Sequence, residues 1–116
     1  MSRAVSKRLF DAMQACVVIA EITSGKDYAA YSADRILRYA VERQFEIIGE
    51  ALGRAVRLDR DILTDLPDLP NIVAFRNRLI HGYDTVDDSI VWNIAQEELP
   101  SLEASLRQWL CAHGDL

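Results

Sequence analysis

Residues that cross-link or punctuate small proteins are few in this sequence of 116 residues, which holds two cysteines, three prolines and two histidines. Cys16 and Cys111 stand far apart with no Cys-x-x-Cys pair, which excludes a disulfide framework and a cysteine-ligated zinc site. We therefore expect two reduced thiols, as in a cytoplasmic protein. Glu-x-x-His pairs, which ligate metals in helical bundles, are also missing, so the sequence predicts neither a metal site nor a cofactor.

Long apolar runs and an excess of positive charge are missing too. The longest apolar run, residues 15–20, is too short to span a membrane, and the charged first residues lead into an amphipathic pattern rather than a signal peptide. We expect a cytoplasmic protein with one domain over residues 1–116. The net charge of −5 argues against a protein that coats nucleic acid non-specifically. It leaves room for a local groove built from arginine, the side chain suited to bidentate phosphate contacts.

The alternation of apolar and polar residues that marks a strand is absent, and apolar residues recur instead at steps of three and four. We expect a first helix from about residue 3 to residue 23, ended by Gly25 in a left-handed cap conformation. After a connector over residues 26–31, Ser32 is expected to cap a long second helix that reaches about Leu58. The apolar stripe of that helix is Ala33, Ile36, Leu37, Ala40, Val41, Phe45, Ile48, Leu52, Ala55 and Val56.

A connector with two prolines follows the second helix, over residues 59–71. This connector could contain a helical turn at residues 60–65. Pro70 is well placed to begin a third helix, because its missing N–H has no partner in a first helical turn. We expect that helix from about residue 71 to residue 81, ended by Gly82.

Thr85 and Asp88 resemble a capping box at the start of a fourth helix, which is expected to reach about Cys111. Pro100 lies inside this helix and should kink it or split it in two. The expected fold is therefore all-α, an antiparallel bundle of four to five helices with short or moderate connections.

Chemically useful side chains gather in one short stretch, Arg76 to Tyr83. Asn77 and His81 share a helix face, whereas about 140° separates Arg76 from His81 on a straight helix. Arg76 and His81 could still converge if the helix tightens or ends at His81, if Arg76 reaches round, or if two chains meet across a two-fold axis. A histidine at a helix C-terminus can act as a general acid or base, and an arginine can stabilise the developing charge of a phosphate. These two groups suffice for RNA cleavage by the ribose 2′-hydroxyl, without a metal ion.

The run Arg76-Asn77-x-x-x-His81-x-Tyr83 resembles the R-x4-H-x-Y motif of HepT toxins, which are members of the HEPN superfamily. The flanks are similar as well, over residues 70–75 and 85–92, and so is the stretch over residues 41–51 on the second helix. The resemblance covers roughly residues 5 to 110. It implies a homodimeric HEPN bundle in which Arg76 and His81 from two protomers line a catalytic cleft at the dimer interface. Asn77 is expected to position these two catalytic residues.

The same resemblance implies a function, the toxin of a type II toxin–antitoxin system that cleaves tRNA or mRNA. The implied partner is a minimal nucleotidyltransferase antitoxin of the MntA type, which transfers AMP from ATP to the motif tyrosine, here Tyr83. Such a modification would inhibit the toxin, because a bulky and negatively charged group two residues from His81 would repel RNA.

RNA contacts are expected from arginines near the motif, namely Arg78, Arg35, Arg38 and Arg43. Glu42, Glu46 and Glu50 share one side of the second helix, and we expect them to pair with arginines or face solvent. One of the three could orient Arg76.

Two alternatives to a nuclease remain open at this stage. The chain could be a non-catalytic helical partner or regulatory subunit of a nucleotidyltransferase, with the Tyr83 loop as its interface. It could also be a structural bundle of a larger assembly, in which Arg76 and His81 lie far apart both within and between chains.

Overall fold

The computed structural model describes the backbone of residues 3–81 and 87–114, and their side chains except for residues 79–81. This part of the chain is helical and contains no strand, which confirms the expected all-α fold. Its helices are α1 (Arg3–Thr23), α2 (Tyr28–Ala33), α3 (Arg35–Leu58), α4 (Ile62–Asp65), α5 (Leu69–His81), α6 (Asp88–Asn93), the π-helical turn η2 (Ile94–Glu98) and α7 (Leu99–Ala112).

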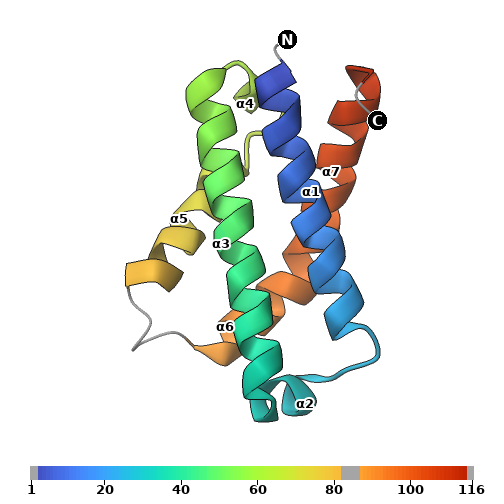
Figure 1. Cartoon of the computed structure of the whole chain (residues 1–116), viewed down its shortest axis with the longest axis vertical. Helices are drawn as coiled ribbons and strands as arrows, with labels where there is room; N and C mark the ends of the chain where they lie inside the picture. The colour runs from blue at the N-terminus through green and yellow to red at the C-terminus, as the bar shows by residue number, and fades with distance from the viewer. Residues whose placement is uncertain (1–2, 82–86, 115–116) are drawn as a thin grey trace.

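The long helices α1, α3 and α7 form the body of the bundle (Figure 1), with α1 antiparallel to both α3 and α7 and the two termini at the same end. The shorter helices α5 and α6 lie behind α3 in that view. None of the described helices is both long enough and apolar enough to cross a membrane.

The core lies where α1 meets α3 and α7. Phe45 of α3 packs edge-on against Phe75 of α5, with ring centroids 5.2 Å apart, and so joins α5 to the core. The Tyr31 ring of α2 lies tilted by 36° against the Trp92 ring of α6, with the ring centroids 5.1 Å apart. The largest fully buried side chains are Tyr31, Phe45, Leu9, Met13, Ile19, Ile48, Leu52, Ile62, Leu69, Leu106, Leu110 and Val5.

Several element boundaries agree with the sequence prediction. Helix α1 has both expected ends, and Gly25 after it has a φ of +74°, the left-handed conformation that glycine adopts without strain. Helix α3 ends at Leu58, and α4 is the expected turn within residues 60–65. Helix α5 begins at Leu69, so that Pro70 lies in its first turn.

The connector expected over residues 26–31 is wrong, because residues 28–33 form α2. Asp27 caps this helix by accepting a hydrogen bond from the Ala30 N–H at 2.9 Å. Asp34, not Ser32, caps α3, and its carboxylate accepts from the Leu37 N–H at 3.0 Å.

Two aspartates therefore start two helices here, and the extended backbone of Asp34 breaks the helix between them. The break changes which residues face inward. Ala33 is exposed and Ile36 is 80% exposed, contrary to their expected place in the apolar stripe.

Pro100 splits the fourth expected helix, as predicted. It has no N–H to donate and its ring crowds the carbonyl four residues earlier, and the backbone widens into η2 directly before α7. The cap of α6 is Asp87, whose carboxylate accepts from the Ser89 N–H at 2.8 Å. Thr85, the expected cap, lies outside the described residues.

Candidate functional site

Helix α5 carries the motif positions Arg76, Asn77 and His81 and packs on α3 at two glycines. A Cβ atom built on Gly49 would lie 2.2 Å from both Cβ and Cγ of Arg76, far inside van der Waals contact. At Gly53, one turn further along α3, the nearest atoms of Val73 would lie 3.9 Å from such a Cβ. Glycine at position 49 therefore allows α5 to approach α3 closely at the residue that begins the motif.

Arg76 is held by this contact and by its neighbour in the chain. The side chain is half-buried, with its aliphatic part against Gly49. Its Nη1 donates a hydrogen bond to Asn77 Oδ1 at 3.0 Å. Its Nε is buried and has no hydrogen-bond partner in the described part of the chain. A buried donor without an acceptor costs free energy and calls for an explanation, such as a functional role.

Asn77 is exposed and uses its carbonyl oxygen to accept from Arg76. The Nδ2 group keeps its two N–H donors for another acceptor. Asn77 thus holds the guanidinium and at the same time offers donors beside it, which suits a pair that binds a phosphate.

His81 is the last residue of α5, so the chain stays α-helical from Arg76 to His81. Positions 77 and 81 then lie on one face of the helix, and positions 76 and 81 about 140° apart around its axis. The side chain of His81, and Tyr83 as a whole, lie outside the described residues.

The arginines expected to contact RNA have different environments. Arg38 is half-buried between α2 and α6, where its Nε lies 3.5 Å from Asp88 Oδ2 and its guanidinium donates to the Ser32 carbonyl. Arg43 pairs with Glu46 at 3.2 Å. Arg35 and Arg78 are exposed and form no ion pair with another described residue.

The glutamates of α3 do not orient Arg76, since within the described residues Asn77 is its hydrogen-bond partner. Glu46 pairs with Arg43, and Glu50 with Arg54 at 3.0 Å, as the sequence led us to expect.

Glu42 is half-buried, and this burial, followed by the nearby Asp88 carboxylate, raises its pKa above the usual range, while Arg38 acts against the shift. No group of His, Cys, Asp and Glu side chains in the described part of the chain could hold a metal ion.

Two residues of the site were missed in the sequence. Gly49 had a signal, because glycine inside a helix costs about 1 kcal/mol relative to alanine, and a pair four residues apart in a regular helix indicates close packing. The sequence around Asp88 indicates only a helix cap, and nothing local to it indicates the ion pair with Arg38.

The sequence is similar to those of proteins named as ribonucleases. A family model described as "Ribonuclease HepT-like" matches residues 12–109. "Putative RNase MJ1380" of Methanocaldococcus jannaschii is 33% identical over 103 residues, which cover 87% of this chain and 92% of that protein. "Probable ribonuclease HepT" of Thermococcus cleftensis is 30% identical over 110 residues, which cover 93% of this chain and 97% of that protein. No solved structure shows a significant match.

Proposed function

The chain belongs to the HepT-like ribonuclease family and is an endoribonuclease, and from this premise we propose that it is the toxin of a type II toxin–antitoxin system that cleaves tRNA or mRNA without a metal ion. The observation that carries the proposed mechanism is the fixed arginine of α5. Arg76 is packed on Gly49 and bonded to Asn77 at 3.0 Å, on the helix that ends at His81.

The chemistry needs one proton acceptor, one proton donor and a cation. The ribose 2′-hydroxyl attacks the adjacent phosphorus as its proton passes to a base, and the bond from phosphorus to the 5′-oxygen breaks as that oxygen takes up a proton. The products are a 2′,3′-cyclic phosphate and a 5′-hydroxyl. His81 serves as the acid or base, while Arg76 and the Asn77 amide stabilise the charge on the phosphate oxygens.

A second copy of the chain completes the site in this proposal. The helical angle of about 140° between positions 76 and 81 directs the two residues to different sides of α5. A homodimer with a two-fold axis beside α5 would bring Arg76 of one protomer toward His81 of the other.

Control of the toxin is assigned to Tyr83. A nucleotidyltransferase antitoxin would transfer AMP from ATP to the tyrosine hydroxyl and release pyrophosphate. The added phosphate carries negative charge and lies two residues after His81, so it would repel the RNA backbone.

The test is cleavage of a labelled RNA by the purified chain in the presence of EDTA. We expect His81→Ala to lower the cleavage rate by about 10²-fold or more, the usual contribution of a general acid or base. His113→Ala is the matched control, because His113 is an exposed histidine near the C-terminus that stacks on Trp109 at 3.7 Å. Equal cleavage by wild type and His81→Ala would refute the proposed mechanism.

Expression of the chain alone tests the proposed toxicity. We expect growth arrest with the wild type and normal growth with His81→Ala. Normal growth with both, at equal protein levels, would overturn the proposed role as a toxin.

A further inference from the structure

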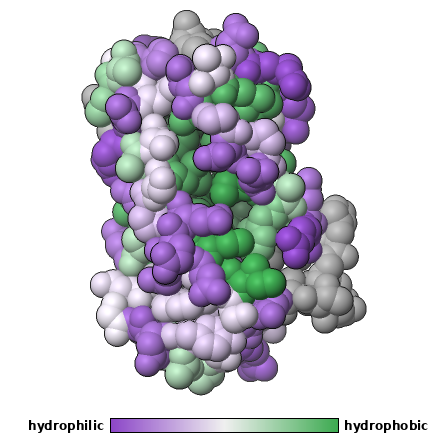
Figure 2. Space-filling view, turned by 180° about the vertical axis from the view of Figure 1, so that it is seen from behind, coloured by the Kyte–Doolittle hydropathy of each residue, from purple (hydrophilic) through white to green (hydrophobic). Residues whose placement is uncertain are grey.

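A groove between the start of α5 and the η2–α7 segment lies on the face opposite to α1 and α3. Its floor is apolar and consists of Leu66, Leu69, Ile72 and Leu102. Figure 2 shows this face of the molecule, where hydrophobic side chains lie in a band between hydrophilic ones. The groove encloses about 610 Å³, which is within the usual range for ligand sites.

The walls of the groove are acidic on both sides. Asp65 and Asp68 lie on the wall formed by α4 and the turn before α5, and Glu97 and Glu98 lie on the wall formed by η2. No ion pair with another described residue involves any of these four carboxylates, and the described residues that line this groove include no lysine, arginine or histidine. The negative charge of this region is therefore not neutralised within the described fold.

We propose that this groove binds a basic amphipathic helix of a partner protein. Apolar side chains of that helix would cover the leucine and isoleucine floor, and its lysines or arginines would pair with the carboxylates on both walls. Docking of an amphipathic helix in an apolar groove is a common mode of peptide recognition, and the unpaired acidic walls select a basic helix over an acidic one.

The length of the hollow suits a helix. A second hollow of about 340 Å³ shares Asp65, Leu66 and Ser105 with the groove and continues along α7 to His113. From Glu97 to His113 the chain rises by roughly 24 Å at the helical spacing of 1.5 Å per residue. A partner helix of about four turns would span that distance.

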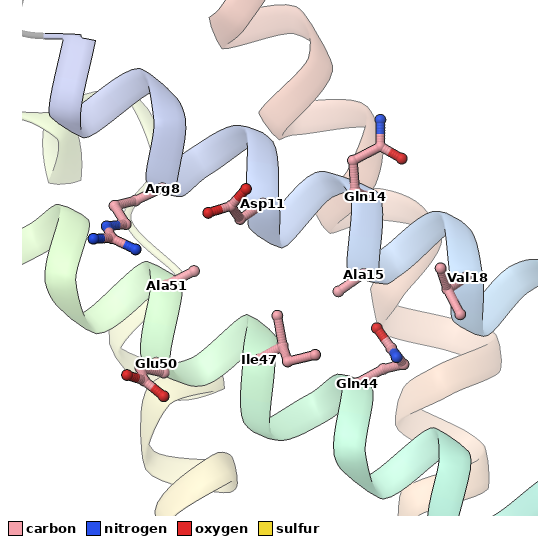
Figure 3. Close-up of a pocket in the computed structure, with 9 residues that line it drawn as sticks. All are labelled: Arg8, Asp11, Gln14, Ala15, Val18, Gln44, Ile47, Glu50 and Ala51. Carbon is pink, nitrogen blue, oxygen red and sulfur yellow. The ribbon is translucent and has the colours of Figure 1, made fainter.

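The groove between α1 and α3 offers no comparable selection (Figure 3). Its lining has side chains of both signs, Arg8 with Asp11 and Glu50. Asp11 is already paired with Lys7, and Glu50 with Arg54. Charge therefore does not favour one kind of occupant there.

RNA is an unsuitable occupant of the acidic groove, because four unpaired carboxylates repel a phosphate backbone. The proposed binding site is thus separate from the nuclease activity and does not depend on it. Ile72 nevertheless connects the two regions, since it lies on the groove floor and on α5, one turn before Arg76.

The test uses the full chain and a fluorescein-labelled synthetic peptide of leucine and lysine with helical periodicity. Its affinity is measured by fluorescence anisotropy and compared with that of a leucine–glutamate peptide of the same pattern and of a lysine–serine peptide. We expect binding of the leucine–lysine peptide only. Glu97→Gln/Glu98→Gln should weaken this binding about fivefold or more, the effect of losing two partly exposed charge pairs.

The matched control is Glu21→Gln/Asp61→Asn, which changes the net charge equally at two exposed residues outside the groove. We expect it to leave the affinity within about twofold, as for surface changes away from a binding site. Equal weakening by both double variants would overturn the proposal, because the peptide would then sense only the overall charge. Absence of binding, or equal binding of the acidic or the lysine–serine peptide, would overturn it as well.

Hydrogen exchange of the complex locates the peptide independently of affinity. We expect slower exchange over residues 65–72 and 97–105, and unchanged exchange over α1. Protection confined to other helices would contradict the assignment to this groove.

Discussion

Gly49 of α3 lies so close to Arg76 of α5 that a methyl group at position 49 would meet Cβ and Cγ of Arg76 at 2.2 Å. Cβ is fixed to the backbone, so no rotation of the arginine side chain can remove the contact. Any residue other than glycine at this position would force α5 away from α3. Because Arg76 and Asn77 both belong to α5, such a shift would move the hydrogen-bonded pair together.

We therefore expect Gly49→Ala to lower the rate of RNA cleavage by about tenfold or more, as misplacement of a catalytic group does. The free energy of unfolding should fall by about 1–3 kcal/mol from overpacking, partly offset by the better helix propensity of alanine. Cleavage assays in EDTA and thermal unfolding measure the two effects.

Gly53→Ala is the matched control, one turn further along the same helix. A Cβ atom there would meet its nearest neighbours at 3.5 Å or more, which is ordinary contact. We expect unchanged cleavage and a gain of up to about 1 kcal/mol in the free energy of unfolding. If Gly49→Ala behaves like Gly53→Ala, close packing at position 49 does not position Arg76.

How far the sequence predicts this structure depends on the range of the interactions. The ends of α1 and the end of α3 follow from periodic apolar residues and local caps, and were predicted. The region of α2 was not, because a helix of six residues shows no apolar stripe and Asp27, Ser32 and Asp34 are all good caps. Packing decides between them, since Tyr31 is buried against Trp92 of α6.

The candidate site also has some features that the local sequence predicts and others that depend on contacts between helices. The order of Arg76, Asn77 and His81 along one helix is readable from the sequence, and so is their chemistry. Contacts between helices are not, since Gly49 meets Arg76 and Arg38 meets Asp88 only after the bundle has formed.

Arg38 and Arg35 should respond differently to the loss of charge. Arg38 joins α3 to Asp88 of α6 and to the Ser32 carbonyl, so Arg38→Gln should lower the free energy of unfolding by about 1 kcal/mol. Arg35→Gln removes an exposed side chain and should leave stability within about 0.5 kcal/mol. If Arg35 contacts a phosphate, its loss weakens RNA binding and lowers the salt slope by about 1.

Asp88→Asn provides the control for Arg38, because the two effects should not add in the double variant. Thermal unfolding and RNA binding at several salt concentrations separate stability from affinity. Loss of RNA affinity in Arg38→Gln at unchanged stability would instead place Arg38 among the RNA contacts.

The two cysteines should differ in reactivity. Burial raises the pKa of the Cys16 thiol to about 12, and the nearby Glu103 adds to this shift. The thiolate is the reactive form, so Cys16 should resist modification in the folded protein, whereas Cys111 is exposed. We expect one thiol to react with a disulfide reagent under native conditions and two after unfolding. Cys111→Ser should abolish the native reaction, and a native reaction that persists would mean that α1 opens readily.

Glu42 should make stability depend on pH. Its pKa is raised in the folded protein, first by burial and then by Asp88, so folding favours the protonated carboxyl. The stability from this group is fully present below the unfolded pKa of about 4.3 and is lost as pH rises through the higher folded value. At pH 7 the half-buried carboxylate is therefore unfavourable.

We expect Glu42→Gln to increase the free energy of unfolding at pH 7, by less than about 1 kcal/mol because the side chain is partly solvated. The gain should shrink as pH falls and vanish below about pH 4, where the wild-type carboxyl is protonated in both states. Glu50→Gln is the control, since it breaks an ion pair with Arg54 at 3.0 Å, does not contribute to the shifted pKa of Glu42 and should bring no gain at pH 7. Denaturant unfolding at pH 4, 5.5 and 7 measures both. A gain at pH 4 equal to that at pH 7 would show that packing rather than charge distinguishes Gln from Glu at position 42.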